Sequence, residues 1–249
     1  MRIRKAAKWV VLFVVLAVAG TGVLLYILAA QVPPDYKPAR LTQAQKQQAA
    51  YEFVNEKLIR ELNNPAQEGR PFDWRVTEDE INRYVASADE IAWLGLDSEP
   101  GRTRDRLARA GLSDPAVALG DGSVTLMARD TRHDKIVSLT FAAEKSGRRL
   151  SLRVAGARVG KVAVPRSMVS EQVEQFKRQL ADSLPAEDDV GGTVERFGVL
   201  LAGLLVGDGY DLEPVFTAGI NNRRVRVTDV TITGKTLTLH LEPVERLSE

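Results

Sequence analysis

The chain has 249 residues, and its 34 lysine and arginine residues nearly balance its 33 aspartate and glutamate residues, for a formal net charge of +1. This length is enough for one good-sized domain or two small ones. The near-neutral balance argues against a nucleic-acid-binding protein, which carries a basic patch. The absence of cysteine excludes disulfides and a lipid-modified N-terminal cysteine.

The N-terminal thirty residues predict a membrane anchor. No charged residue occurs from Trp9 to Ala30, and a helix of this length spans roughly 30 Å, the thickness of a bilayer core. Four basic residues precede it: Arg2, Arg4, Lys5 and Lys8. The positive-inside rule therefore predicts a cytoplasmic N-terminus and an extracytoplasmic chain after residue 31. A cleaved signal peptide is the alternative, but its apolar core is normally only about 7 to 15 residues long.

The segment after the anchor predicts a stalk and two helices. Residues 31–40, QVPPDYKPAR, hold three prolines and suggest a short extended stalk before an exported domain of residues 41–249. The first helix is expected from Thr42, a plausible cap, to a stop at Asn64-Pro65. Its apolar stripe is Tyr51, Val54, Leu58 and Leu62.

A second helix is predicted at VTEDEINRYV, where Thr77 and Glu80 form a capping box. Asn82 lies beside its apolar stripe, and we expect its amide to make a structural hydrogen bond, either to a neighbouring strand edge or as the cap of a loop. The charged residues 98–112 that follow are broken by Pro-Gly and predict a solvated loop with room for one helical turn.

The middle of the chain predicts an antiparallel meander. Strands are expected around residues 117–119, 123–129, 136–142 and 150–156, because apolar and polar residues alternate and Asp121-Gly122 signals a hairpin. In VAGARVGKVAVPRSM, Gly160 predicts a bulge or a close backbone approach, and Pro165 ends the pairing because it cannot donate to a ladder.

The rest of the chain predicts a helix, a hinge and a hairpin. The helix is expected from Ser167 to about Leu184, followed by an acidic hinge with a possible sub-boundary near 185–193. The uncharged run 197–206 is too short to span a bilayer as a helix. Three interpretations of this run remain open: a buried core helix, one wall of a hydrophobic cavity, or a segment that dips into the membrane surface. A hairpin turning at Gly234-Lys235 closes the chain, and whether the two strand-rich halves share one sheet is left open.

The residues of common catalytic and metal sites are mostly missing. His133 and His240 are the two histidines, and neither has a second ligand at zinc spacing, so no metal and no cofactor are expected. No nucleophile elbow or phosphate loop occurs. The acidic pairs in TEDE and AEDD are accounted for by a helix cap and a solvated hinge. We therefore expect a protein that is not an enzyme.

Several stretches together resemble a known group of proteins. An N-terminal span, the helix VTEDEINRYV, the turn and strand DGSVTLMAR and the strand end RVGKVAVP resemble the YpmS-like single-pass bacterial envelope proteins. They resemble the LmeA-like phospholipid-binding domains more distantly. The resemblance covers about residues 1–180, and residues 193–249 depart from it. The YpmS-like resemblance implies an anchored extracytoplasmic domain, and we expect its anchor in the cell inner (cytoplasmic) membrane. The LmeA-like resemblance implies lipid binding by a curved sheet around helices and no catalytic residues.

Together these features predict an α+β fold, with an N-terminal transmembrane helix followed by a curved antiparallel meander sheet packed on amphipathic helices. The first functional hypothesis is a non-enzymatic module that binds lipid or another hydrophobic ligand. It predicts an apolar cavity lined by Leu126, Leu139, Phe141, Leu152 and Phe197. The alternative is a scaffold or interaction subunit of an envelope complex, with a filled core and an exposed apolar patch. A hydrolase is the third alternative. The expected partners are the bilayer, through residues 9–30, and a lipid ligand or an envelope protein, with no nucleic acid.

Overall fold

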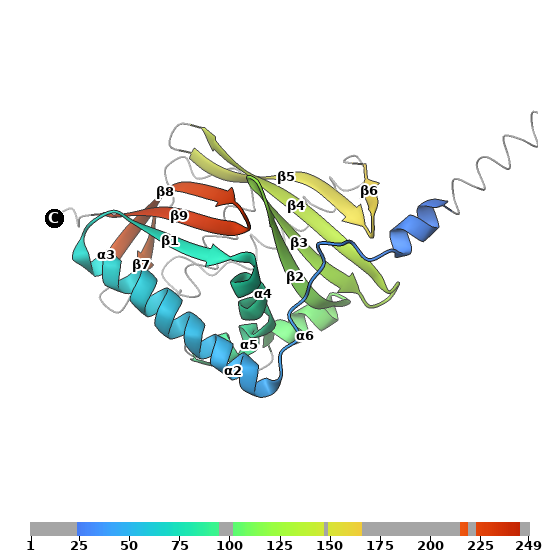
Figure 1. Ribbon diagram of the computed structural model, residues 1–249, viewed down its shortest axis with the longest axis horizontal. Coiled ribbons are helices and arrows are strands. Elements are labelled where there is room, and N and C mark those ends of the chain that lie inside the picture. The colour runs from blue at the N-terminus through green and yellow to red at the C-terminus, as the bar shows by residue number, and fades with distance from the viewer. Residues whose placement is uncertain (1–23, 95–101, 147–148, 166–214, 219–222, 245–249) are drawn as a thin grey trace, which may run out of the picture.

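The structure is a computed structural model that describes residues 24–94, 102–146, 149–165, 215–218 and 223–244. These residues form an α+β fold with two antiparallel sheets, one of five strands and one of four (Figure 1). The predicted α+β class is confirmed. The two strand-rich parts of the chain lie in separate sheets.

The five-stranded sheet is the predicted meander, because each strand pairs with the next one in the chain. Its strands are β2 (Leu112–Gly120), β3 (Ser123–Asp130), β4 (Lys135–Ser146), β5 (Arg149–Val159) and β6 (Val162–Val164). The register shifts between Thr140 and Phe141, where Ala155 of β5 has no residue opposite. Such a bulge increases the local twist and bends the strand, which accounts for the curvature of this sheet (Figure 1).

The four-stranded sheet has the order β1-β9-β8-β7. Its strands are β1 (Phe72–Thr77), β7 (Val215–Ala218), β8 (Arg223–Thr233) and β9 (Thr236–Pro243). The predicted hairpin at Gly234-Lys235 is confirmed by the pairing of β8 with β9. Strand β1 was not predicted, although Phe72, Trp74 and Val76 alternate with polar residues.

One long helix crosses the four-stranded sheet (Figure 1). It consists of α2 (Gln43–Glu52), the π-helical η1 (Phe53–Asn63) and α3 (Asn64–Glu68). The predicted stop at Asn64-Pro65 is wrong, because the helix continues through Pro65 to Glu68. The helix ends at Gly69, whose positive φ of 73° is typical of a helix terminus.

The main core lies between this helix and the sheet. Leu58 and Leu62 of η1 are 8% and 2% exposed and pack with Trp74 of β1 and with apolar residues of β8 and β9. Thr42 caps the helix through a capping box with Gln45, as predicted. Tyr51, however, is 60% exposed, so its assignment to the buried stripe is wrong.

Three short helices stand beside the five-stranded sheet: α4 (Glu78–Ala86), α5 (Ala88–Leu94) and α6 (Arg102–Arg109). The prediction of a loop over 98–112 is wrong for α6. Arginine, leucine and alanine favour helix, and Arg104 is tied to Asp89 of α5 by an ion pair of 3.8 Å. Helix α4 contacts β2, and its residues join a small core with Ile232 of β8.

The N-terminal end of the described chain is helical over residues 24–30. No helix of the described residues is long and apolar enough to cross a membrane, and most of the expected span lies before them. The expected helix 167–184, the sub-boundary near 185–193 and the run 197–206 also lie outside the described residues.

Candidate functional site

Three of the residues expected to line an apolar cavity share one face of the five-stranded sheet. Leu126 of β3 is opposite Leu139 of β4, and Phe141 is one alternate position further along β4. Phe141 is 3% exposed, Leu139 is half-buried and Leu126 is 38% exposed. Leu152 is opposite Ala143 in the register of β5, and Phe197 lies outside the described residues.

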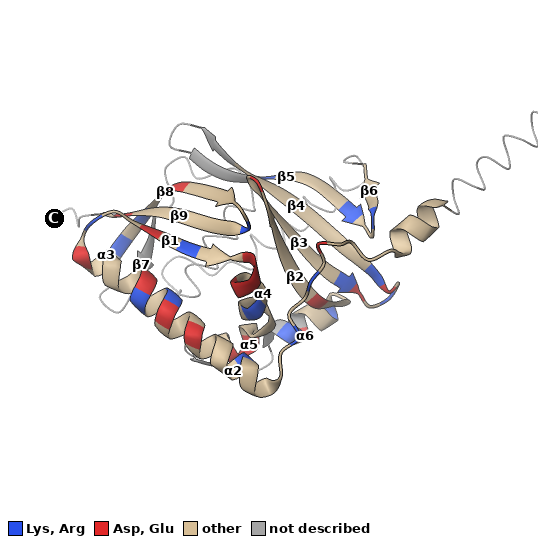
Figure 2. Ribbon diagram, viewed as in Figure 1, with Lys and Arg blue, Asp and Glu red and all other residues tan. Residues whose placement is uncertain are grey.

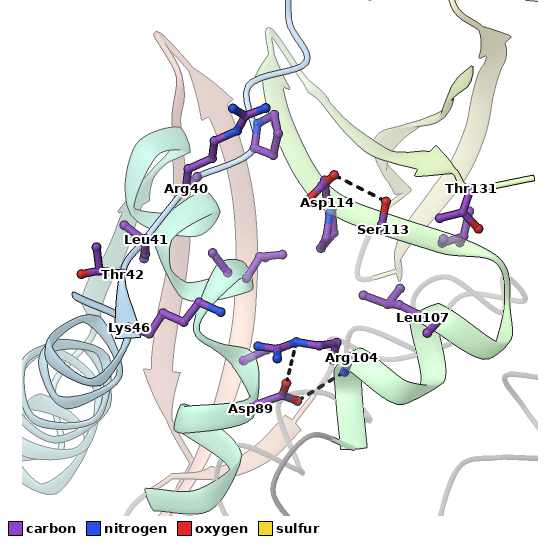
Figure 3. A pocket seen from close by; sticks show the side chains of 18 residues that line it. Arg40, Leu41, Thr42, Lys46, Asp89, Arg104, Leu107, Ser113, Asp114 and Thr131 are labelled. Atoms are coloured by element: carbon purple, nitrogen blue, oxygen red, sulfur yellow. Dashed lines mark hydrogen bonds and ion pairs between the residues drawn. The ribbon is translucent and has the colours of Figure 1, made fainter. Parts of the chain in front are cut away.

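A pocket of about 810 Å³ lies elsewhere, where the linker, residues 31–42, meets the short helices. Its walls are residues 38–42 of the linker, the start of α2, the end of α4, the start of α5, helix α6, the start of β2 and Thr131 of the β3–β4 turn (Figure 3). Leu126, Leu139 and Phe141 are not among the described residues that line it. The sequence did not indicate this pocket, because it is built from seven segments with no shared motif.

The walls of the pocket are largely apolar. Ten lining residues are aliphatic or proline: Pro38, Ala39, Leu41, Val85, Ala86, Ala88, Leu107, Ala108, Leu112 and Pro115. Three are basic, Arg40, Lys46 and Arg104, and two are acidic, Asp89 and Asp114. The pocket therefore combines an apolar surface with an excess of positive charge.

Lys46 and Arg104 point toward one another from opposite walls of the pocket in Figure 3. Arg104 pairs with Asp89, whose carboxylate also accepts a hydrogen bond of 3.3 Å from the Arg104 backbone N–H. Among the described residues, Lys46 and Arg40 make no ion pair.

The linker is fixed to the pocket wall rather than standing free as a stalk. Tyr36 is 8% exposed, packs on Ala116, Met127 and Ile136, and donates a hydrogen bond of 2.7 Å from its hydroxyl to the backbone carbonyl of Asp114. Burial, and next the Asp114 charge, raise the pKa of the Tyr36 hydroxyl above its ordinary value, so this hydroxyl stays a donor at neutral pH.

The start of β2 is irregular where it forms this wall. Asp114 has a positive φ of 47°, and the register with β3 shifts between Ser113 and Ala116. The bulge turns the Asp114 carbonyl toward the linker, where Tyr36 binds it. Arg129 of β3 lies 3.9 Å from the Asp114 carboxylate and offsets its charge.

Asn82 of α4 makes the structural hydrogen bonds to a strand that the sequence led us to expect. Its side-chain oxygen accepts from the Val117 backbone N–H at 2.7 Å, and its amide nitrogen donates to the Val117 carbonyl at 2.8 Å and to the Glu78 carbonyl at 3.0 Å. Asn82 is 6% exposed. The two hydrogen bonds between Asn82 and Val117 thus join helix α4 to the edge strand β2 in the way that the backbone of a neighbouring strand would.

The capping box expected at Thr77 and Glu80 is present at the start of α4. The Glu80 carboxylate accepts from the Thr77 backbone N–H at 2.8 Å and lies 3.3 Å from the Lys57 ammonium. Burial alone would raise the pKa of Glu80, but the Thr77 hydrogen bonds and the Lys57 charge lower it below its ordinary value. The capping box fixes where α4 begins, and Asn82 lies in the second turn of this helix.

The Glu78 carboxylate links helix α4 to strand β2 and to the β8–β9 turn. Its carboxylate accepts a hydrogen bond of 2.8 Å from the Leu119 backbone N–H in β2 and pairs at 2.9 Å with Lys235 in the β8–β9 turn. Burial opposes ionisation of Glu78, but the bonds from Lys235 and Leu119 lower its pKa below the ordinary value. The charged form of Glu78 therefore holds α4 between the two sheets.

Replacement of Glu78 by glutamine should lower stability at neutral pH by about 1–3 kcal/mol, the range for a charge-assisted hydrogen bond. Because the folded protein lowers this pKa, the contribution is present above the ordinary glutamate pKa of about 4.3 and is lost as the pH falls through the lower value. The difference between wild type and Glu78→Gln in urea unfolding should therefore shrink below about pH 4.

Glu56→Gln is the matched control, because Glu56 forms an exposed ion pair of 2.9 Å with Arg60. Exposed pairs contribute only about 0–1 kcal/mol. A constant difference between wild type and Glu78→Gln from neutral to acid pH would contradict this role of the Glu78 charge.

The histidines lie in local polar contacts. His133 is in the β3–β4 turn and pairs at 2.6 Å with Asp130. His240 of β9 contacts Asp73 and Thr231, each at 2.8 Å, on the side of the sheet opposite to the buried Trp74. The described residues contain no group of three or more metal-ligating side chains, and neither histidine lines the pocket.

Gly160 lies in the two-residue turn between β5 and β6, with a φ of 55°. It makes a close approach to the backbone of Leu28 and Ala29, at the end of the helix 24–30. Strand β6 ends at Val164, directly before Pro165. The turn is therefore a contact point for the N-terminal helix.

A comparison with models of protein families found no match, and comparisons with curated proteins and with solved structures found none either. The resemblance to YpmS-like and LmeA-like proteins therefore stays a prediction.

Proposed function

We propose that this protein is a membrane-anchored extracytoplasmic domain that binds a lipid or another hydrophobic ligand with an anionic group, and that it does so without catalysis. The observation that carries this proposal is the pocket of about 810 Å³ with apolar walls and an excess of basic residues. Binding sites for small molecules typically measure about 300–1,000 Å³ and are mostly apolar with a few polar groups.

The charges of the pocket support an anionic ligand. Arg104 is already paired with Asp89, while Lys46 and Arg40 have no ion pair among the described residues. A carboxylate or phosphate placed between Lys46 and Arg104 would gain charge-assisted hydrogen bonds, and its alkyl part would contact residues such as Leu41 and Leu107.

The sequence and the exposed N-terminal helix support the anchor. Residues 9–30 carry no charge, and in the described part of this run Leu24, Leu25, Tyr26 and Ile27 are between 46% and 67% exposed. Such side chains are suited to a lipid environment. The same helix continues through the fixed linker into the pocket wall, so an anchored domain would hold its pocket near the bilayer.

The test is labelling of the full chain, reconstituted in phosphatidylcholine vesicles, with a diazirine-bearing palmitic acid. Wild type should be labelled on peptides from the linker and α6 as well as on the anchor. Ala108→Trp, which adds a large side chain to the pocket wall, should reduce the pocket labelling at least about fivefold, because overfilling such a site costs about 1–3 kcal/mol.

Ala110→Trp is the matched control, because Ala110 is exposed, lies two residues away and is not among the described lining residues. It should label like wild type. Lys46→Glu should weaken labelling by the anionic probe without weakening labelling by a diazirine-bearing alkyl alcohol. Labelling confined to the anchor in wild type would contradict the pocket as a lipid site and favour the scaffold alternative.

A further inference from the structure

The helix 24–30 is fastened to the five-stranded sheet through backbone groups. The Leu28 carbonyl accepts a hydrogen bond of 3.0 Å from the Lys161 backbone N–H in the β5–β6 turn. The Gly160 N–H in turn donates to the Ile136 carbonyl of β4 at 2.7 Å. Carbonyls at the end of a helix lack partners within it, and here the β5–β6 turn supplies one.

Gly160 allows this contact because it has no side chain. A Cβ atom at Gly160 would lie 2.7 Å from the Leu28 carbonyl oxygen and still closer to the Ala29 carbonyl oxygen. Both are backbone atoms, which cannot rotate away. Gly234 in the β8–β9 turn has the same φ of 55° and no atom within 4 Å of such a Cβ. The positive φ alone accounts for glycine at position 234. At position 160 glycine is also needed because a side chain would collide with the end of the helix 24–30.

A side-chain contact reinforces the junction. The Lys135 ammonium at the start of β4 lies 4.5 Å from the centre of the Tyr26 ring, a cation–π distance. Tyr26 is 67% exposed and belongs to the uncharged run. Tyrosine is enriched at the boundary between bilayer and water, where its ring is apolar and its hydroxyl is hydrated.

The length of the uncharged run places this junction relative to a bilayer. Residues 9–30 would form a helix of about 33 Å, compared with about 30 Å for the hydrocarbon core. Ala29 and Ala30 would thus leave the core, and the β5–β6 turn, which contacts Leu28 and Ala29 through Lys161 and Gly160, would lie at the depth of the headgroups.

The adjacent surface is basic. We define the turn end of the sheet as residues 129–135 and 158–161. It holds five basic and two acidic residues, a net charge of 5 − 2 = +3 with histidine neutral. The basic residues are Arg129, Arg132, Lys135, Arg158 and Lys161. Figure 2 shows several Lys and Arg segments at this end of the five-stranded sheet. Arg129 pairs with Asp134, and Asp130 pairs with His133. Arg132, Arg158 and Lys161 are exposed and make no ion pair within the described residues.

We propose that the turn end of the five-stranded sheet lies on the bilayer and binds anionic lipid headgroups, and that the contact of Gly160 with the helix end fixes this orientation. The proposal rests on the membrane anchor of the proposed function but not on the pocket. Basic residues beside a membrane anchor are attracted to anionic lipids, and a rigid junction keeps them there. The anchor therefore orients the domain as well as tethering it.

The experiment uses the absence of cysteine in the chain. His133→Cys labels the turn end at an exposed residue outside the basic set, and Asp121→Cys labels the β2–β3 turn at the opposite end of β3. Each full chain, carrying nitrobenzoxadiazole on the cysteine, is reconstituted in vesicles of phosphatidylcholine and phosphatidylglycerol with a nitroxide on the lipid headgroup. The label at 133 should be quenched by the nitroxide, and the label at 121 should not.

Gly160→Ala tests the junction, with Gly234→Ala as the control of equal φ. In both labelled chains, Gly160→Ala should abolish the difference in quenching between positions 133 and 121, whereas Gly234→Ala should preserve it. Circular dichroism of both variants checks that the sheets remain folded. Equal quenching at positions 133 and 121 in the parent chains would overturn the proposal.

Flotation of the same vesicles separates the two proposals. A chain that floats after alkaline carbonate washing but shows no preferential quenching at position 133 would overturn the orientation and leave the anchor standing. A chain that does not float would overturn the anchor and the orientation together.

Discussion

Replacement of Trp74 by alanine should lower the free energy of unfolding by about 3–5 kcal/mol, the usual cost of removing a large buried aromatic side chain. Trp74 of β1 is 4% exposed and packs in the main core between the long helix and β8 and β9. Its indole N–H also donates a hydrogen bond of 3.0 Å to the Lys57 carbonyl in the π-helical segment. Alanine would leave a cavity and remove the side-chain donor to this carbonyl.

The measurement is urea unfolding followed by circular dichroism, with two further variants. Trp74→Phe keeps most of the apolar volume but loses the N–H donor, so its effect should be smaller than that of alanine. Tyr51→Ala, at a residue 60% exposed on the same helix, should change stability by less than about 0.5 kcal/mol. Equal effects of Trp74→Ala and Tyr51→Ala would contradict the placement of β1 in the core.

Replacement of Asn82 by alanine should lower the free energy of unfolding by about 2–4 kcal/mol, because it leaves two buried backbone groups of Val117 without their partner. The hydrogen bonds of 2.7 and 2.8 Å between Asn82 and Val117 join α4 to β2. A hydrophobic replacement such as Asn82→Leu should not restore stability, because it would supply no donor or acceptor.

Asn55→Ala is the matched control for Asn82. The Asn55 amide also donates to the carbonyl four residues earlier, that of Tyr51, at 3.0 Å, but it has no strand partner in the described residues. Its replacement should cost well under about 1 kcal/mol. Hydrogen exchange at the Val117 amide gives a second readout, since Asn82→Ala should speed it and Asn55→Ala should not. Unchanged exchange in Asn82→Ala would contradict the assigned bond.

Local signals predicted most of the individual elements. Alternation along 123–129 and 136–142 identified β3 and β4, and the capping residues Thr42 and Thr77 identified the starts of two helices. These signals depend only on residues near one another in the chain. These local signals failed at residues 102–109. The charged residues there suggested a loop, but they form the exposed helix α6.

Long-range pairing could not be predicted in the same way. Strand β1 lies in the four-stranded sheet because it pairs with β9, more than 150 residues later. The sequence shows that Phe72, Trp74 and Val76 alternate, but nothing in that alternation identifies β9 as the partner. The separation into two sheets follows from this pairing and was left open for the same reason.

The candidate site was likewise predictable only where it depends on local sequence signals. Leu126, Leu139 and Phe141 share a sheet face as alternation implies, but the pocket lies between other elements. It depends on where Tyr36 fixes the linker and where α6 lies, and both are tertiary contacts. Gly160 was recognised as unusual from its neighbours, while the helix end that requires it is 131 residues earlier at Ala29.

Native mass spectrometry of the full chain, released from nanodiscs of phosphatidylcholine and phosphatidylglycerol, tests lipid binding in the pocket most directly. Wild type and Ala110→Trp should retain one lipid molecule per chain under activation that strips loosely bound lipids, and Ala108→Trp should lose it. A lipid-free wild type under these conditions, or the same retained lipid in Ala108→Trp, would contradict the assignment of the pocket as the lipid site.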